Sequence, residues 1–192
     1  MPDGAYLHDD GTVEEFQCAA GPAGWRYVGS LPGSRVDVTV DSRWRQIRLE
    51  VLAGAWMLRG GVSGTDTGWL RGAARDLSEA QEHSARATGF AGRSPGLLVA
   101  TARSLQLAVG GSVRLRLVEI TEPVLAVRLT DQEWVLAGVT EHPAGDAVLP
   151  VHRYRIADLG TGLTTELHLC GDIVLSGPGV ELHRLSGPPT GS

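Results

Sequence analysis

Two short patterns in the sequence match signatures of known hydrolase active sites. Residues 66–68, Asp-Thr-Gly, spell the aspartic-protease triplet, whose mechanism needs two facing carboxylates that share a proton. The chain has no second copy of the triplet. Residues 61–65, GVSGT, differ from a nucleophile elbow because Gly64 follows Ser63 with no residue between them. We predict a glycine-rich turn here and no catalytic residues.

Three histidines near the C-terminus, His152, His168 and His183, are candidate metal ligands. Zinc sites are built from ligands at characteristic short spacings, which these three residues lack. His168 and His183 also alternate with leucines, so they are expected on the polar face of strands. We therefore predict no metal site and no cofactor, and we keep an unrecognised hydrolase as the least favoured alternative.

Trp44 and Arg48 are the strongest candidates for ligand binding. They belong to residues 42–51, SRWRQIRLEV, whose alternation predicts a strand with Ile47 and Leu49 on its buried face. Trp44 and Arg48 would share the opposite face. An indole on a polar face needs apolar cover, and an arginine fork suits phosphate or hydroxyl groups. We predict that both residues line a ligand site.

Trp56 and Trp134 are predicted as further wall residues of that site. Two other interpretations of Trp44 stay open, because an indole is equally at home between two layers of a core or on a solvated surface. Substitution distinguishes the three. Removal of a core indole lowers stability, removal of a surface indole changes little, and removal of a ligand-lining indole abolishes binding.

Composition and charge exclude several functional classes. All 17 basic residues are arginine, so a phosphate-binding loop with its lysine and Schiff-base chemistry are both ruled out. The net charge of −5 argues against nucleic-acid binding. The start of the sequence lacks the features of a signal peptide, and no apolar run is long enough to span a membrane. With only two cysteines, Cys18 and Cys170, we expect a cytoplasmic protein with reduced thiols.

Period-two alternation of polar and apolar residues recurs down most of the chain. Such runs, separated by glycine-rich turns, are typical of half-buried antiparallel strands. We predict an all-β protein with one curled antiparallel sheet of more than ten strands, barrel-like or a spiral β-roll, and at most one or two short helices. The domain would span 13–185, with flexible segments at 1–12 and 186–192. Residues expected to be buried are Ile47, Leu49, Leu115, Leu117, Leu167 and Leu169; those expected to be solvated or paired are Arg114, Arg116, Glu166 and His168.

Two local expectations concern elements that are less regular. Residues 76–87, DLSEAQEHSARA, begin with Asp76 and Glu79 in a capping-box spacing and continue with good helix formers. We predict a short helix there, with a strand as the alternative. Gly110-Gly111 is expected to join two strands, LQLAV and SVRLRL, in a hairpin.

Residues 101–134 resemble the bacterial glycolipid-binding family, a group of spiral β-roll proteins. The matching positions are Arg103, Leu105, Leu107, Gly110, Leu115, Leu117, Pro123, Leu125, Val127, Gln132 and Trp134. A Trp-Arg strand also matches at Trp44, Arg45, Arg48, Glu50 and Val51, and the C-terminal part matches at Tyr154, Glu166, Leu167, Pro178, Gly179 and Arg184. The resemblance implies a rolled sheet and a glycolipid or other fatty-acyl ligand.

Together these observations favour a non-catalytic binding protein. A rolled sheet has a concave face, where apolar residues can accept acyl chains and polar groups at the mouth can hold a head group. The alternative is a protein-interaction or structural module with no small-molecule ligand.

Overall fold

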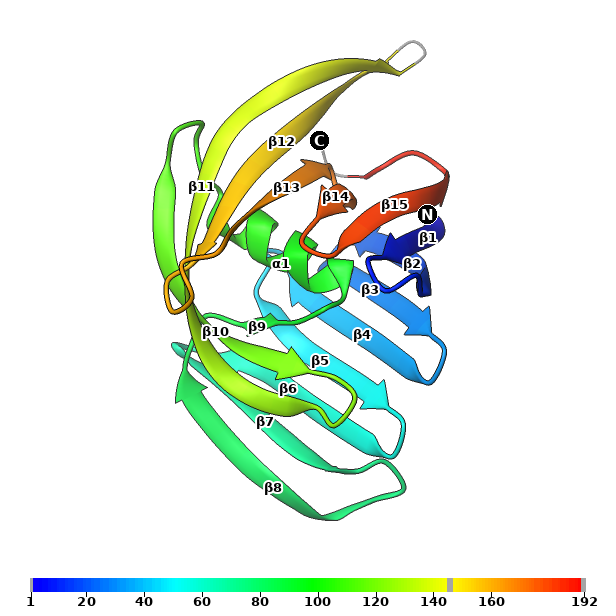
Figure 1. Cartoon of the computed structure of the whole chain (residues 1–192), viewed down its shortest axis with the longest axis vertical. Coiled ribbons are helices and arrows are strands. Elements are labelled where there is room, and N and C mark those ends of the chain that lie inside the picture. The colour runs from blue at the N-terminus through cyan, green and yellow to red at the C-terminus, as the bar shows by residue number, and fades with distance from the viewer. Residues whose placement is uncertain (1, 145–146, 191–192) are drawn as a thin grey trace.

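The chain forms one large sheet around a single helix. The computed structural model describes residues 2–144 and 147–190, and within them there are fifteen strands and one helix (Figure 1). Their bounds are β1 Asp3–His8, β2 Val13–Gly21, β3 Gly24–Leu31, β4 Ser34–Asp41, β5 Gln46–Ala53, β6 Trp56–Ser63, β7 Asp66–Ala73, β8 Asp76–Arg86, β9 Phe90–Ala91, α1 Pro95–Leu105, β10 Ser112–Thr121, β11 Ala126–Ala144, β12 Ala147–Asp158, β13 Thr164–Cys170, β14 Ile173–Gly177 and β15 Val180–Ser186.

Strands that follow one another in sequence are neighbours in the sheet, except β8 and β9, which form its two edges. The order runs from β8 back to β1, then from β15 back to β9, so β1 and β15 pair and join the two ends of the chain. Every pairing is antiparallel except the short parallel contact of β9 with β10. The predicted all-β fold with one curled sheet is confirmed.

The two edges of the sheet are linked across the open side of the roll. Residues 87–89 carry the chain from β8 at one edge to β9 at the other, and the sheet curls around α1 between them (Figure 1). The backbone N–H of Thr88 donates to the carbonyl of Arg116 at 2.9 Å, and the Arg71 guanidinium donates to the carbonyl of Val124 at 2.9 and 2.6 Å. These bonds hold the edges near one another.

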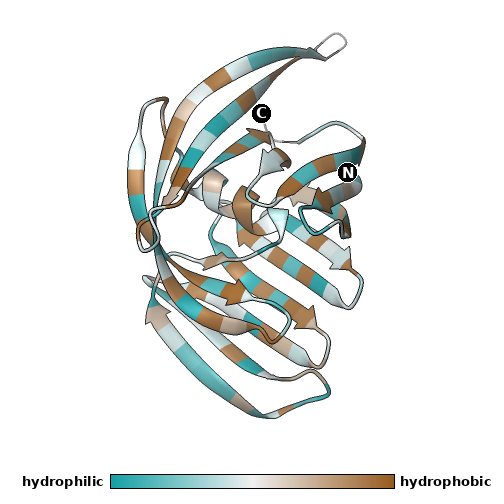
Figure 2. Cartoon of the chain, viewed as in Figure 1, coloured by the Kyte–Doolittle hydropathy of each residue, from teal (hydrophilic) through white to brown (hydrophobic). Residues whose placement is uncertain are grey.

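Apolar and polar residues alternate along the strands, as Figure 2 shows. Five of the six leucines and isoleucines expected in the core are buried: Leu49, Leu115, Leu117, Leu167 and Leu169. The expected polar positions are exposed and paired, with Arg114 bound to Glu133, Arg116 to Asp131 and Glu166 to Arg153; half-buried His168 bonds to Ser176.

The prediction for Ile47 is wrong. Arg48 pairs with Thr39, whereas Gln46 pairs with the next residue of β4, so Ile47 is an extra residue in a bulge. Ile47 is 47% exposed, and Gln46 turns inward instead. There the Gln46 amide bonds to the backbone N–H and carbonyl of Phe90, which satisfies the buried edge of β9.

The helix prediction for residues 76–87 is also wrong, because this segment is strand β8. Its helix propensity is overridden by pairing with β7 from Asp66–Arg86 to Ala73–Asp76. Asp76 accepts the N–H of Ser78 at 2.8 Å, which makes an Asx-turn instead of a helix cap. The helix lies at Pro95–Leu105, and no strand precedes Gly110. The predicted hairpin is therefore wrong, because the turn at Gly110-Gly111 connects α1 to β10.

The segments expected to be flexible make defined contacts. Residues 3–8 form β1 between β2 and β15, with Ala5 and Tyr6 buried. In the tail, Thr190 donates its N–H and its hydroxyl to the carboxylate of Asp172. Residues 191 and 192 lie outside the described residues.

Candidate functional site

The turn between β4 and β5 is fixed by a carboxylate. One oxygen of Asp41 accepts the backbone N–H groups of Arg43 and Arg45 at 2.9 Å each, and the other accepts Nε of Arg45 at 2.8 Å. Trp44 adopts the left-handed conformation, with φ of 63°, which is uncommon for a bulky residue. The turn therefore places two arginines and one indole in fixed backbone positions.

A cleft of about 870 Å³ lies beside this turn, and we call it the arginine cleft. It is bounded by the turn, the β6–β7 connection, the end of β8, the last turn of α1, β10 and Leu159. Its residues are Arg43, Arg45, Val62, Gly64, Thr65, Arg86, Ala87, Thr88, Ser104, Leu105, Arg114, Leu115, Arg116, Asp131 and Leu159. Five apolar side chains and five arginines thus share one cleft, which lies at the open side of the roll.

Three of the five arginines are already neutralised. Arg45 is bound to Asp41 and Arg114 to Glu133, while Arg116 makes two bonds to Asp131 at 2.8 and 2.9 Å. Hydrogen bonding to Arg116 holds the pKa of Asp131 below its ordinary value.

Arg43 and Arg86 differ from the other three arginines. Among the residues that the structure describes, their guanidinium groups make no ion pair or hydrogen bond. The cleft therefore carries two arginines whose charge no described carboxylate offsets.

A smaller cavity of about 340 Å³ lies on the indole of Trp44, and we call it the tryptophan pocket. The Trp44 ring lies 5.4 Å from that of Trp25 in the core, and the guanidinium of Arg103 lies 5.2 Å above it. His152 and Tyr154 also line the pocket. The pocket and the arginine cleft both use residues of the 42–45 turn and of the end of α1, but they share no lining residue. Burial lowers the pKa of His152, and Arg103 lowers it further.

A third cavity of about 530 Å³ lies between α1 and strands β10–β12. Trp134 lines it together with apolar residues of the helix and of the strands, chiefly Leu97, Leu98, Leu117 and Ile156. The indole N–H of Trp134 donates to Gln132 at 2.9 Å. This cavity lies inside the roll, where the concave face of the sheet meets the helix.

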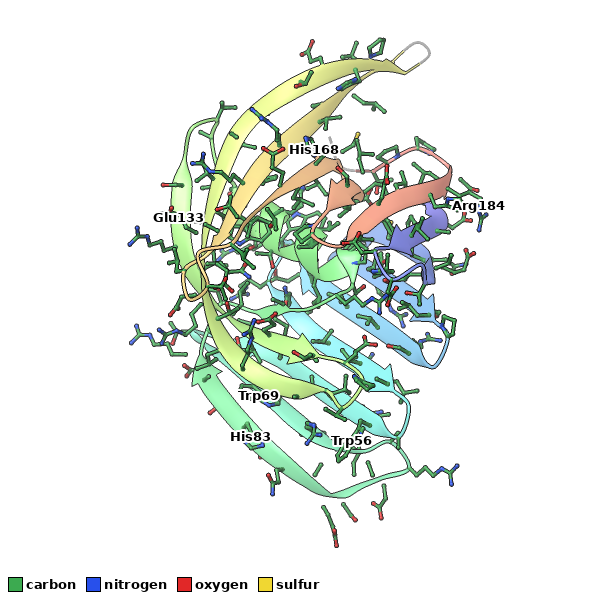
Figure 3. The ribbon with its side chains drawn as sticks, viewed as in Figure 1. Trp56, Trp69, His83, Glu133, His168 and Arg184 are labelled. Atoms are coloured by element: carbon green, nitrogen blue, oxygen red, sulfur yellow. The ribbon has the colours of Figure 1, made fainter. Side chains whose placement is uncertain are left out.

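The four predicted site residues do not come together. Trp44 and Trp134 line different cavities. Arg48 is exposed on the outer face of β5, 3.7 Å from Glu50, so it does not share a face with Trp44. Trp56 is half-buried on β6, and the guanidinium of Arg71 lies 4.0 Å from the centre of its ring. Figure 3 shows Trp56 well away from Glu133, the residue that precedes Trp134 in β11.

The arginine cleft is the feature that sequence reasoning missed. Arg43 and Arg45 flank Trp44 in the sequence, and that spacing was a usable signal. Arg86 and the Arg114–Arg116 pair come from distant segments that only the fold places beside the turn. Nothing in their local patterns distinguishes them from solvated arginines on ordinary strands.

The described residues contain no cluster of three or more His, Cys, Asp or Glu side chains arranged to hold a metal ion. Within the same residues, α1 is too short to cross a membrane as a helix.

The fold occurs in at least one solved structure. No protein-family model matches the sequence, and no curated protein matches it. A DUF1089 family protein from Pseudomonas aeruginosa, determined by crystallography at 1.80 Å, is similar in structure with a TM-score of 0.57. The two share 16% sequence identity, and the similarity covers 92% of this chain and 88% of that one. This degree of likeness shows a shared fold.

Proposed function

We propose that the chain is a non-catalytic binding protein for an amphipathic ligand, held in the arginine cleft. One observation carries this proposal: the same cleft is lined by five apolar side chains, which we call its floor, and by five arginines, which we call its rim. Its volume falls in the range of about 300–1,000 Å³ that is usual for small-molecule sites. An apolar ligand without a polar end would leave the rim unused, and a purely polar ligand would leave the floor unused.

The sequence resemblance and the neighbouring pocket narrow the ligand class. The resemblance to the glycolipid-binding family makes a glycolipid or another lipid the first candidate. The tryptophan pocket offers the faces of Trp44 and Tyr154 beside the cleft, and aromatic faces suit sugar rings.

Ser94, whose hydroxyl hydrogen-bonds to a buried carboxylate, has a structural role. The hydroxyl of Ser94 donates to Oε1 of Glu14 at 2.9 Å, and His8 bonds to the other oxygen of that carboxylate. Ser94, Glu14 and His8 are each at most 3% exposed. A catalytic serine needs access to substrate as well as an adjacent base, and the buried Ser94 hydroxyl lacks that access. The cluster instead anchors the start of α1 to β2.

A fluorescence titration with dansyl-undecanoic acid tests the proposal. We expect saturable binding at one molecule per chain. Leu159→Ser should weaken binding several-fold, because part of the apolar floor is lost. Leu7→Ser is the matched control, since Leu7 is 40% exposed against 44% for Leu159 and lies outside the cleft. Lack of saturable binding, or equal weakening by both substitutions, would overturn the proposal.

One observation favours the rival function, a protein-interaction module. Strand β8 is at an edge of the sheet and pairs only with β7 within the described residues, so its outer backbone groups are open to another strand. This rival predicts association through β8. Gln81→Pro, in the middle of β8, would then abolish association without affecting binding of the dansyl probe.

A further inference from the structure

The arginine cleft concentrates positive charge on a chain that is negative overall. The chain carries a net charge of −5, yet five arginines and a single carboxylate, Asp131, line the cleft. Such a local excess attracts anions even when the whole molecule does not. Arginine also presents a planar fork of donors that matches the oxygens of carboxylate and phosphate groups.

Two of these arginines are available to a ligand. The rim side chains Arg45, Arg114 and Arg116 are occupied by protein carboxylates. Arg43 and Arg86 have no such partner among the described residues, as shown above. Both residues line the same cleft, one from the β4–β5 turn and the other from the end of β8.

We propose that the cleft binds a single-chain amphiphile with an anionic head group, whose carboxylate or phosphate lies between Arg43 and Arg86 and whose chain lies on the apolar floor. This inference rests on the proposed function, because it specifies the charge of the ligand at the same site. The floor residues Leu105 and Leu115 give the chain an apolar surface next to the arginines. A cleft of about 870 Å³ suits one acyl chain of moderate length.

The negative end of the α1 dipole disfavours an anion in the cleft, but the arginines outweigh it. Ser104 and Leu105 lie in the last turn, where the helix dipole is equivalent to roughly half a negative charge. Arg43 and Arg86 bring two full positive charges, and Arg103 in the same last turn offsets the dipole. The balance at the cleft therefore stays positive.

The test compares two probes with the same chain and fluorophore but a charged or an uncharged head group: dansyl-undecanoic acid and its methyl ester. We expect the acid to bind about tenfold more tightly than the ester, since one charge-assisted hydrogen bond is worth that much. Added sodium chloride should weaken binding of the acid and leave binding of the ester unchanged, because salt screens exposed charges. Inorganic phosphate serves as a third ligand. It lacks a chain, so it should displace the acid only at concentrations far above those at which the acid itself binds.

Arginine variants test whether Arg43 and Arg86 cause the tighter binding of the acid. The double variant Arg43→Gln/Arg86→Gln should weaken binding of the acid about tenfold and leave the ester unchanged. The control, Arg75→Gln/Arg155→Gln, removes the same charge from exposed positions outside the cleft and should change neither affinity.

The possible results separate this inference from the proposed function. Equal affinity for acid and ester, or equal effects of the two double variants, overturns the inference while saturable binding still supports the proposed function. Binding of neither probe overturns both. If inorganic phosphate displaces the probe at a concentration similar to the one at which dansyl-undecanoic acid itself half-saturates the protein, the proposed amphiphile is wrong. That result would indicate a site for a free anion.

Discussion

The imidazole of His8 and the carboxylate of Glu14 lie 2.9 Å apart in the interior of the roll, both almost inaccessible to solvent. The same carboxylate accepts the hydroxyls of Tyr27 and Ser94 at 2.8 and 2.9 Å. Glu14→Ala leaves all three donors without a partner, so we expect a loss of about 3–5 kcal/mol in the free energy of unfolding. Urea denaturation measures this loss.

A neighbouring glutamate gives the control for this experiment. Glu15 is exposed, and Arg184 is its one ion-pair partner among the described residues, so Glu15→Ala should cost less than about 1 kcal/mol. A similar cost for both substitutions would show that the buried cluster is no more important than a surface pair.

Leu117 on β10 faces the core and is 2% exposed. We expect Leu117→Ala to lower the free energy of unfolding by about 2–5 kcal/mol, because the side chain is removed from a packed interior. Leu129 on the paired strand β11 is 49% exposed, and Leu129→Ala should cost less than about 0.5 kcal/mol. A reversed order of the two costs would mean that the strand faces the other way.

The alternation that predicted Leu117 explains how much of the fold was accessible from sequence. A half-buried strand repeats every two residues, so the sheet, its antiparallel character and most of its core follow from local pattern. Ile47 was misplaced because one bulge residue reverses the alternation, and the sequence of a bulge has no distinct signature. The helix at residues 95–105 was missed because α1 is buried on most of its surface and shows little amphipathic contrast.

The candidate site was less predictable than the fold, for a physical reason. Trp44 drew attention through its residue type, and the structure does place it at a cavity. The arginine cleft depends instead on the curl of the sheet, which brings β8 and β10 beside the β4–β5 turn. No local pattern encodes the meeting of strands so far apart in the sequence.

Gly96 in α1 lies against the aromatic ring of Tyr27, where a Cβ atom would overlap the ring. Alanine in a helix is normally more favourable than glycine by about 1 kcal/mol. Here we expect Gly96→Ala to destabilise the protein instead, because the helix must move away from β3. Gly138→Ala is the control, since a Cβ there meets open space. Thermal denaturation checks both; a higher melting temperature for Gly96→Ala would contradict the close contact.

Trp44 gives a test of backbone conformation. Its φ of 63° costs an L-residue about 1–2 kcal/mol, and glycine avoids this cost. Trp44→Ala loses the contacts with Trp25 and keeps the unfavourable conformation, so Trp44→Gly should be the more stable variant by about 1 kcal/mol. At Ser42, whose φ is not positive, the order of the alanine and glycine variants should be the reverse. Urea denaturation of the four variants decides the point, and a more stable Trp44→Ala would refute it.

The ion pair between Arg26 and Asp37 should make part of the stability depend on pH. Hydrogen bonding to Arg26 lowers the pKa of Asp37 in the folded protein, against the opposing effect of burial. A lowered pKa means that the unfolded chain takes up the proton first. The stabilisation is therefore present above pH of about 4 and is lost as the pH falls through the folded-state pKa.

A double-mutant cycle with Arg26→Gln and Asp37→Asn isolates this contribution from other titrating groups. The Arg26 side chain is 54% exposed, so we expect a coupling free energy of only about 0.5–1 kcal/mol at pH 7. The coupling should decrease when the cycle is measured by urea denaturation at acidic pH, because protonated Asp37 no longer attracts the guanidinium. A coupling that stays constant or grows on acidification would mean that the pair is held by shape and not by charge.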